Sequence, residues 1–117
     1  MIPPRQIECS FLIPVRRDAN LSDGAPHATE LWEWLNDELF ERFGGRTVAP
    51  GLYEGFYRDP ETQKRVDDQS HKFMVAVSAL QFDELRALLA EVCVEFQQKC
   101  IYLSVAGEVE FIEATPS

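Results

Sequence analysis

The segment from residues 46 to 79 constrains the fold most, because it joins two strand patterns through a strong turn signal. Residues 71–77 (HKFMVAV) alternate between larger apolar and other side chains, which is typical of a strand with one buried face. Residues 53–57 are rich in tyrosine and phenylalanine, which suit a half-buried pleated strand. Between the two runs, Asp59 and Pro60 supply the acceptor and the fixed φ that open a turn. We therefore predict a long hairpin.

The first arm of this hairpin contains two glycines. Gly51 and Gly55 lie on either side of Tyr53. A glycine within a strand often marks a bulge or a close approach of another backbone. We therefore expect the first arm to be irregular.

The region before the hairpin predicts a strand and a helix. Residues 7–15 alternate, with Ile7 and every second residue after it on one face. Pro26 fits the first helical position, and Gly44-Gly45 fit the end of a helix. Between them, apolar side chains recur at three- and four-residue spacing, Phe40 among them, so we expect one amphipathic helix here.

The region after the hairpin repeats this pairing. Residues 82–96 have the periodicity of a second amphipathic helix, with acidic residues in its first turn. Residues 101–105 alternate as a strand, and residues 109–112 suggest a short final strand or an extended tail beyond Gly107.

This order of elements predicts an α+β fold over a single domain, residues 1–117. Strand, helix, strand, strand, helix, strand is the βαββαβ arrangement of ferredoxin-like domains. We expect a four-stranded antiparallel sheet with the first and third strands central and both helices on one face. A short C-terminal strand or extension would follow.

We expect the sheet face without helices to be covered by a partner or a ligand. Its central positions carry small or moderately apolar side chains and no charge, whereas a face left to water usually alternates to charged or polar residues. A second copy of the chain or a small ligand are the two candidates. We expect a homodimer, because symmetric dimers dominate among soluble oligomers.

The composition of the chain limits the classes of partner and cofactor that we expect. A net charge of −9 disfavours nucleic acid and an anionic membrane surface. The three cysteines are an odd number without paired metal-ligand spacing, and no basic leader or long apolar span is visible. We therefore expect a cytoplasmic protein with reduced thiols. No glycine-rich phosphate loop or nucleophile motif is present, so we predict no cofactor.

Two segments of the hairpin carry a family resemblance. The sequence FGGRTVAPGLYEGFYRD, followed by DDQSHKFMVAV, resembles a group of small bacterial ferredoxin-like proteins of undescribed function. The matching features are a helix ending in Gly-Gly, a threonine that opens the next strand, an aromatic-Gly-x-aromatic segment and an aspartate turn. They fall on Gly44, Gly45, Thr47, Tyr53, Gly55, Phe56, Tyr57 and Asp59. The resemblance implies the fold and no activity.

His71 is the candidate catalytic residue. A histidine titrates near neutrality, and Asp67 or Asp68 nearby offers a carboxylate that would orient it as a base. The alternative is a histidine at the end of the sheet that bonds to backbone. The same three residues have ligand types for a divalent metal, but a strand sends alternate side chains to opposite faces, so we predict no metal site.

The candidate ligand-binding residues are aromatic and basic. Tyr53 and Tyr57 lie on one side of the first hairpin arm and suit the wall of a groove, while Arg58 pairs with Asp59 or receives an anion. Arg16 ends the first strand, and together with Arg46 it is a candidate anion site. The alternative for each is a solvated surface side chain.

Two functions from different classes follow. The first is a non-catalytic module that binds a small molecule or a protein through the helix-free face or a cleft at the strand ends. The second is a cofactor-independent enzyme of the dimeric α+β barrel type, an isomerase or monooxygenase, in which His71, Tyr57 or Arg58 acts on a substrate held against the sheet.

Overall fold

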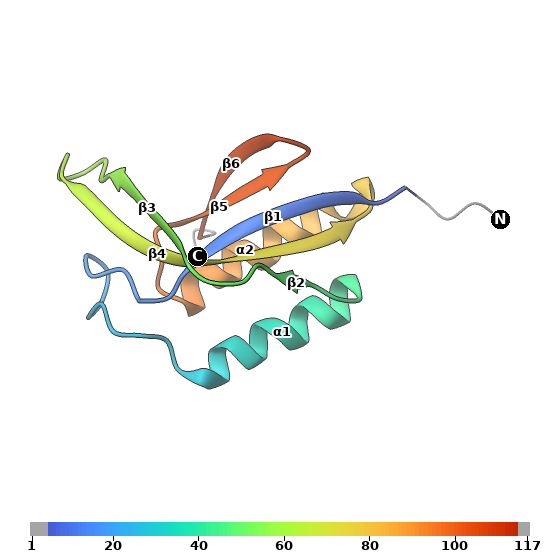
Figure 1. Ribbon diagram of the computed structural model, residues 1–117, viewed down its shortest axis with the longest axis horizontal. Coiled ribbons are helices and arrows are strands. Elements are labelled where there is room, and N and C mark those ends of the chain that lie inside the picture. The colour runs from blue at the N-terminus through green and yellow to red at the C-terminus, as the bar shows by residue number, and fades with distance from the viewer. Residues whose placement is uncertain (1–4, 115–117) are drawn as a thin grey trace.

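The computed structural model describes residues 5–114 and is an α+β structure. Two helices pack on a six-stranded antiparallel sheet in the order β2-β4-β1-β5-β6, with β3 also paired to β4 (Figure 1). The strands are β1 (Ile7–Pro14), β2 (Thr47–Val48), β3 (Tyr53–Arg58), β4 (Arg65–Val77), β5 (Cys100–Val105) and β6 (Glu108–Glu113). The helices are α1 (Thr29–Phe43) and α2 (Phe82–Glu95), the latter preceded by the 3-10 turn η1 (Ala79–Gln81).

The sheet has more strands than the four that were predicted. The central position of β1 and β4 is confirmed, but the first hairpin arm is split into β2 and β3. The split falls at Pro50 and Gly51, where Gly51 has a φ of 78°. The chain beyond β5 folds back as β6, because Ala106 and Gly107 both take positive φ and close a tight turn. The expected irregular arm and C-terminal strand are therefore both present.

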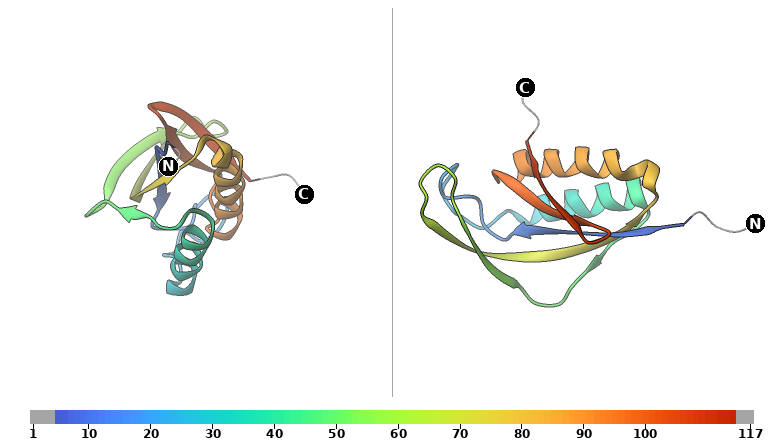
Figure 2. Two further views of the ribbon diagram at one scale, coloured as in Figure 1. Left: turned by 90° about the vertical axis from the view of Figure 1, so that its right-hand side faces the viewer. Right: turned by 90° about the horizontal axis from the view of Figure 1, so that it is seen from above.

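The core lies between the sheet and the helices. Both helices cover the same face of the sheet (Figure 2). The alternating residues of β1, Cys9, Phe11 and Ile13, have no exposed surface and pack under them. Phe11 stacks on Phe73 of β4 with ring centroids 5.3 Å apart. The period-two pattern of β1 and β4 thus sets which face is buried.

Helix α1 differs from its prediction at the N-terminus. It begins at Thr29, three residues after Pro26, because Pro26 forms an isolated bridge with Arg16 instead of opening the helix. The C-terminus is as predicted, with Gly44 left-handed and its N–H bonded to the carbonyl of Phe40. The Phe40 side chain, assigned to the apolar stripe, is instead 66% exposed. Neither helix of the described residues is long and apolar enough to cross a membrane.

His27 is buried beside the end of β1. Its Nε2 lies 2.8 Å from the carbonyl oxygen of Pro14, and its ring packs edge-on against Trp32 and Phe96. Its Nδ1 is buried without a hydrogen-bond partner among the described residues. Burial, only partly offset by the bond to Pro14, lowers the pKa of His27 below its ordinary value.

We expect stability to fall at acid pH through His27. Because its pKa is lowered on folding, the neutral ring stabilises the fold above its ordinary pKa near 6.5, and this contribution is lost as the pH drops below that value. The wild type should lose about 0.5–1 kcal/mol more than His27→Gln between pH 7.5 and pH 5.5. Urea unfolding at the two pH values measures the difference. If both proteins lose the same free energy of unfolding between the two pH values, His27 is not the cause of the pH dependence.

Candidate functional site

A cleft of about 730 Å³ opens between the β3–β4 hairpin and the loop that follows β1. It exists because β4 is longer than its neighbour: the last pair between β1 and β4 joins Pro14 to Ser70, and residues 65–69 of β4 pair with β3 alone. After a backbone hydrogen bond from Val15 to Gln69, the loop leaves the strand. We call this space, with residues 14–20 on one wall and residues 54–57 and 65–69 on the other, the hairpin cleft.

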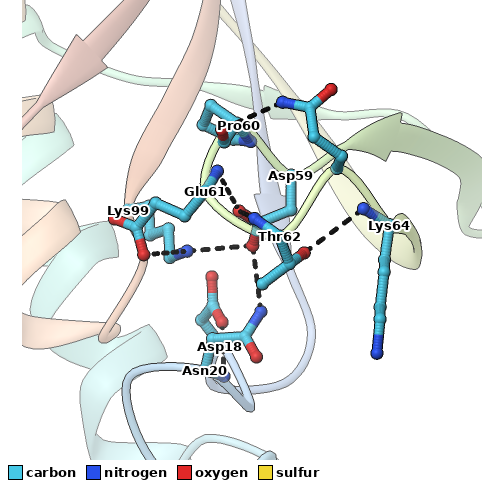
Figure 3. Close-up of polar contacts among 9 residues, drawn as sticks. Asp18, Asn20, Asp59, Pro60, Glu61, Thr62, Lys64 and Lys99 are labelled. Carbon is cyan, nitrogen blue, oxygen red and sulfur yellow. Dashed lines mark hydrogen bonds and ion pairs between the residues drawn. The ribbon is translucent and has the colours of Figure 1, made fainter.

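The tip of the hairpin is tied back to the body by Asp59 (Figure 3). The carboxylate has no exposed surface. Its Oδ1 accepts hydrogen bonds from the backbone N–H groups of Glu61 at 2.8 Å and Thr62 at 3.2 Å. Its Oδ2 accepts from Asn20 at 3.1 Å and Lys99 at 3.0 Å. The Lys99 bond, followed by the backbone donors, lowers the pKa of Asp59, so the carboxylate stays ionised at neutral pH.

The cleft walls combine aromatic rings with charges of both signs. The aromatic rings are Phe56 and Tyr57, the carboxylates are Asp18, Glu54, Asp67 and Asp68, and the guanidinium groups are Arg16, Arg17 and Arg65. Residues of β3 and β4 alternate between the two sides of the hairpin, so each side presents one aromatic ring next to charged groups.

The charges of the cleft are unequally compensated. Arg65 contacts Asp67 at 2.8 Å and lies 4.1 Å from the centroid of Phe56, and Arg17 pairs with Asp23. Asp68 takes part in none of the ion pairs that the described residues form. Burial, and then repulsion from Asp67, raises the pKa of Asp68. A positively charged ligand bound in this cleft would compensate the negative charge of this half-buried carboxylate.

Gly55 and Tyr57 shape the surroundings of Asp68. Gly55 is paired with Asp68 across the hairpin, and a Cβ at Gly55 would lie 3.2 Å from Oδ1 of that carboxylate, tighter than ordinary packing. Burial, and then the carboxylates of Asp18 and Asp68, raises the pKa of Tyr57, so its phenol stays protonated. The result is a neutral aromatic surface with a hydrogen-bond donor beside an uncompensated anion.

The structure brings two of the predicted ligand-binding residues into the cleft. Tyr57 and Arg16 line opposite walls. Tyr53 lies outside it, where its ring faces the Lys72 ammonium at 5.5 Å. Arg58 is exposed and paired across the hairpin with Arg65. The alternative in which Arg58 pairs with Asp59 is wrong, because Lys99 holds that carboxylate.

Arg46 and His71 lie away from the cleft. Arg46 follows the C-terminal end of α1 and donates to Asn36 at 2.9 Å, so the structure does not form the predicted anion site with Arg16. His71 lies on the helix side of β4, where it packs edge-on against Trp32 at 5.3 Å. His71 does not line the hairpin cleft, and its role as a base stays a prediction. Among residues 5–114, no three His, Cys, Asp or Glu side chains are arranged to hold a metal ion.

Comparison with known proteins identifies fold relatives. No protein-family model and no curated protein sequence matches the chain. The fold is similar to a phage SAM lyase in complex with S-methyl-5'-thioadenosine, with a TM-score of 0.71 and 14% identity over 97% of this chain and 94% of that one. It is also similar to a phage SAM lyase in the apo state, with a TM-score of 0.63 and 13% identity over 100% and 99% of the two chains. At these identities the likeness establishes the fold alone.

Proposed function

We propose that the protein binds S-adenosylmethionine in the hairpin cleft and cleaves it as a lyase, releasing S-methyl-5'-thioadenosine. The observation that carries this proposal is the uncompensated Asp68 carboxylate beside the Tyr57 ring, in a cleft of ligand size. The likeness of the whole chain to a phage SAM lyase supplies the class of ligand. We also propose that the connectivity is ferredoxin-like and that the chain is related to the small bacterial ferredoxin-like proteins that it resembles.

The cleft suits such a ligand in size and surface. Its volume of about 730 Å³ falls within the range of roughly 300–1,000 Å³ of small-molecule sites. An adenine ring stacks on aromatic side chains, and such stacking contributes about 1–3 kcal/mol per base. Tyr57 offers this surface on the same side of the hairpin as Asp68, whereas Phe56 lies on the other side with the Arg65 guanidinium over its ring.

The charges suit the rest of the ligand. S-adenosylmethionine carries a sulfonium next to the nucleoside and an amino-acid carboxylate at the far end. We assign the sulfonium to Asp68, because that carboxylate neighbours Tyr57, and the ligand carboxylate to Arg16 on the opposite wall. Arg16 takes part in none of the ion pairs among residues 5–114, so its guanidinium is available for bidentate contact.

The proposed reaction balances within the substrate. The bond between the sulfonium sulfur and Cγ breaks, and its electron pair goes to sulfur, which becomes the neutral thioether. The substrate's own carboxylate oxygen attacks Cγ and closes a lactone, so no water is consumed and no net proton is transferred. The cleft's contribution is to hold the sulfonium and the carboxylate at fixed positions from which a carboxylate oxygen reaches Cγ, and to limit competing water.

A non-catalytic binding module is the second candidate. The helix-free sheet face exposes large apolar side chains, among them Tyr53, Val109 and Phe111, which favours the expected homodimer. Such a module would bind the nucleoside without cleaving it. In the isomerase or monooxygenase alternative, Tyr57 is the candidate acting residue that lines the cleft, whereas His71 packs against Trp32.

Titration calorimetry with S-methyl-5'-thioadenosine tests the binding part of the proposal. We expect saturable binding at micromolar concentrations that weakens about tenfold in Tyr57→Ala, equivalent to one stacked ring. Tyr53→Ala is the matched control, because this tyrosine lies outside the cleft, and it should bind as the wild type does. Absence of binding at millimolar ligand would refute the proposal.

A further inference from the structure

We infer that Asp59 is a positioning residue of the hairpin cleft: by holding Asn20 and Lys99 at once, its carboxylate fixes the two walls at the separation that a ligand needs. The inference rests on the proposed function, since it concerns the same cleft. It assigns a role to a residue that does not itself line the cavity.

The sheet alone does not fix the outer part of the hairpin. Beyond Gln69, β4 has β3 as its neighbour and no longer pairs with β1, so the arms extend past the sheet as a two-stranded ribbon. Isolated two-stranded ribbons are marginally stable in water. The position of the cleft wall at residues 54–57 therefore depends on what holds the tip.

The groups that hold the tip belong to two segments that are hydrogen-bonded to each other. The loop wall is joined to the connection between α2 and β5 by two hydrogen bonds, from the Asp18 N–H to the Gln97 carbonyl at 3.0 Å and from the Gln98 side chain to the Arg16 carbonyl at 2.8 Å. Lys99 belongs to the same connection and immediately precedes β5. Asp59 thus attaches the hairpin both to the opposite wall and to the anchor of that wall.

The two oxygens of Asp59 have separable tasks. Oδ1 shapes the turn through the N–H groups of Glu61 and Thr62, whereas Oδ2 makes both contacts across the cleft. Figure 3 shows Asn20 and Lys99 reaching this carboxylate from separate segments. Changing Asn20 or Lys99 therefore tests the cross-cleft contacts while leaving the turn of the hairpin its own hydrogen bonds.

Hydrogen exchange and ligand affinity of Lys99→Met and Asn20→Ala test the inference. We expect the Asp59 amide, which donates to the Lys64 carbonyl, to exchange at least tenfold faster in both variants, and the Kd for S-methyl-5'-thioadenosine to rise at least fivefold. Amides of β1 should keep their wild-type rates. Lys99→Arg should restore the affinity to within twofold. Glu61→Gln is the matched control, because Glu61 is largely exposed and 3.9 Å from the Lys99 ammonium.

Each result decides one claim. Unchanged exchange at the tip in both variants, or faster exchange with unchanged affinity, would overturn the role assigned to Asp59. If the wild type binds neither S-methyl-5'-thioadenosine nor S-adenosylmethionine, the proposed function fails and the positioning role for a ligand falls with it. The exchange rates would then still show whether Asp59 holds the walls together, so the two failures are distinguishable.

Discussion

Asp68→Asn is expected to weaken the binding of a cationic adenosyl ligand by at least tenfold while changing that of neutral S-methyl-5'-thioadenosine by less than twofold. The carboxylate has no cation beside it among residues 5–114, so a ligand cation is the charge it would gain. An asparagine keeps the shape and removes that attraction, and tenfold corresponds to about 1.4 kcal/mol. Calorimetry with sinefungin, a non-cleavable analogue with an amine in place of the sulfonium, measures the effect.

Asp67→Asn is the matched control for this variant. It removes the same charge one residue earlier, but Asp67 points to the other side of β4 and is already paired with Arg65. We expect its effect on both ligands to stay within about threefold, since exposed ion pairs contribute little. Equal losses of sinefungin and thioadenosine affinity in Asp68→Asn would contradict a charge-reading role for this carboxylate.

Phe11→Ala is expected to lower the free energy of unfolding by about 3–5 kcal/mol. Phe11 has no exposed surface and stacks on Phe73 in the middle of the central strand pair. Its loss removes buried apolar area and leaves a cavity that a sheet held by strands on both sides cannot close. Because domains of this kind are stable by only about 5–15 kcal/mol, the variant should be partly unfolded at 37 °C. Urea denaturation followed by circular dichroism measures the change.

Phe40→Ala makes the same substitution on the surface. Its side chain is 66% exposed, and its contribution to the C-terminal cap of α1 comes from the backbone carbonyl, which the change preserves. We expect an effect within about 0.5 kcal/mol. A large loss in Phe40→Ala, or a small one in Phe11→Ala, would mean that the core lies elsewhere than between the helices and β1.

Much of the fold could be predicted because period-two and helical patterns report burial directly. Cys9, Phe11 and Ile13 alternate because one face of β1 is covered, and Gly44 ends α1 because a left-handed residue is needed there. Pro26 misled the prediction, since a proline also fits an edge bridge such as the one it makes with Arg16. The first hairpin arm forms two strands, β2 and β3, because Gly51 takes a positive φ between them. The glycines of this arm predicted an irregularity but not a division into two strands.

The candidate site was predictable only in part. Tyr57 was named as an aromatic residue suited to the wall of a groove, and Arg16 was named from its position at the end of the first strand; both line the cleft. The signal for Asp68 was present in the Asp-Asp pair, but the missing cation that makes it unusual depends on the folded neighbours. The Asp59–Lys99 contact joins residues 40 positions apart, and no local pattern reports such a pairing.

The most direct test of the central claim is whether the purified protein converts S-adenosylmethionine to S-methyl-5'-thioadenosine. Chromatography of timed incubations, with a protein-free control for spontaneous breakdown, measures both compounds. We expect thioadenosine to form at a rate proportional to protein concentration, and Tyr57→Ala to slow it while Tyr53→Ala does not. Thioadenosine formation no faster than in the protein-free control would contradict the lyase account, and binding without conversion would favour the non-catalytic module.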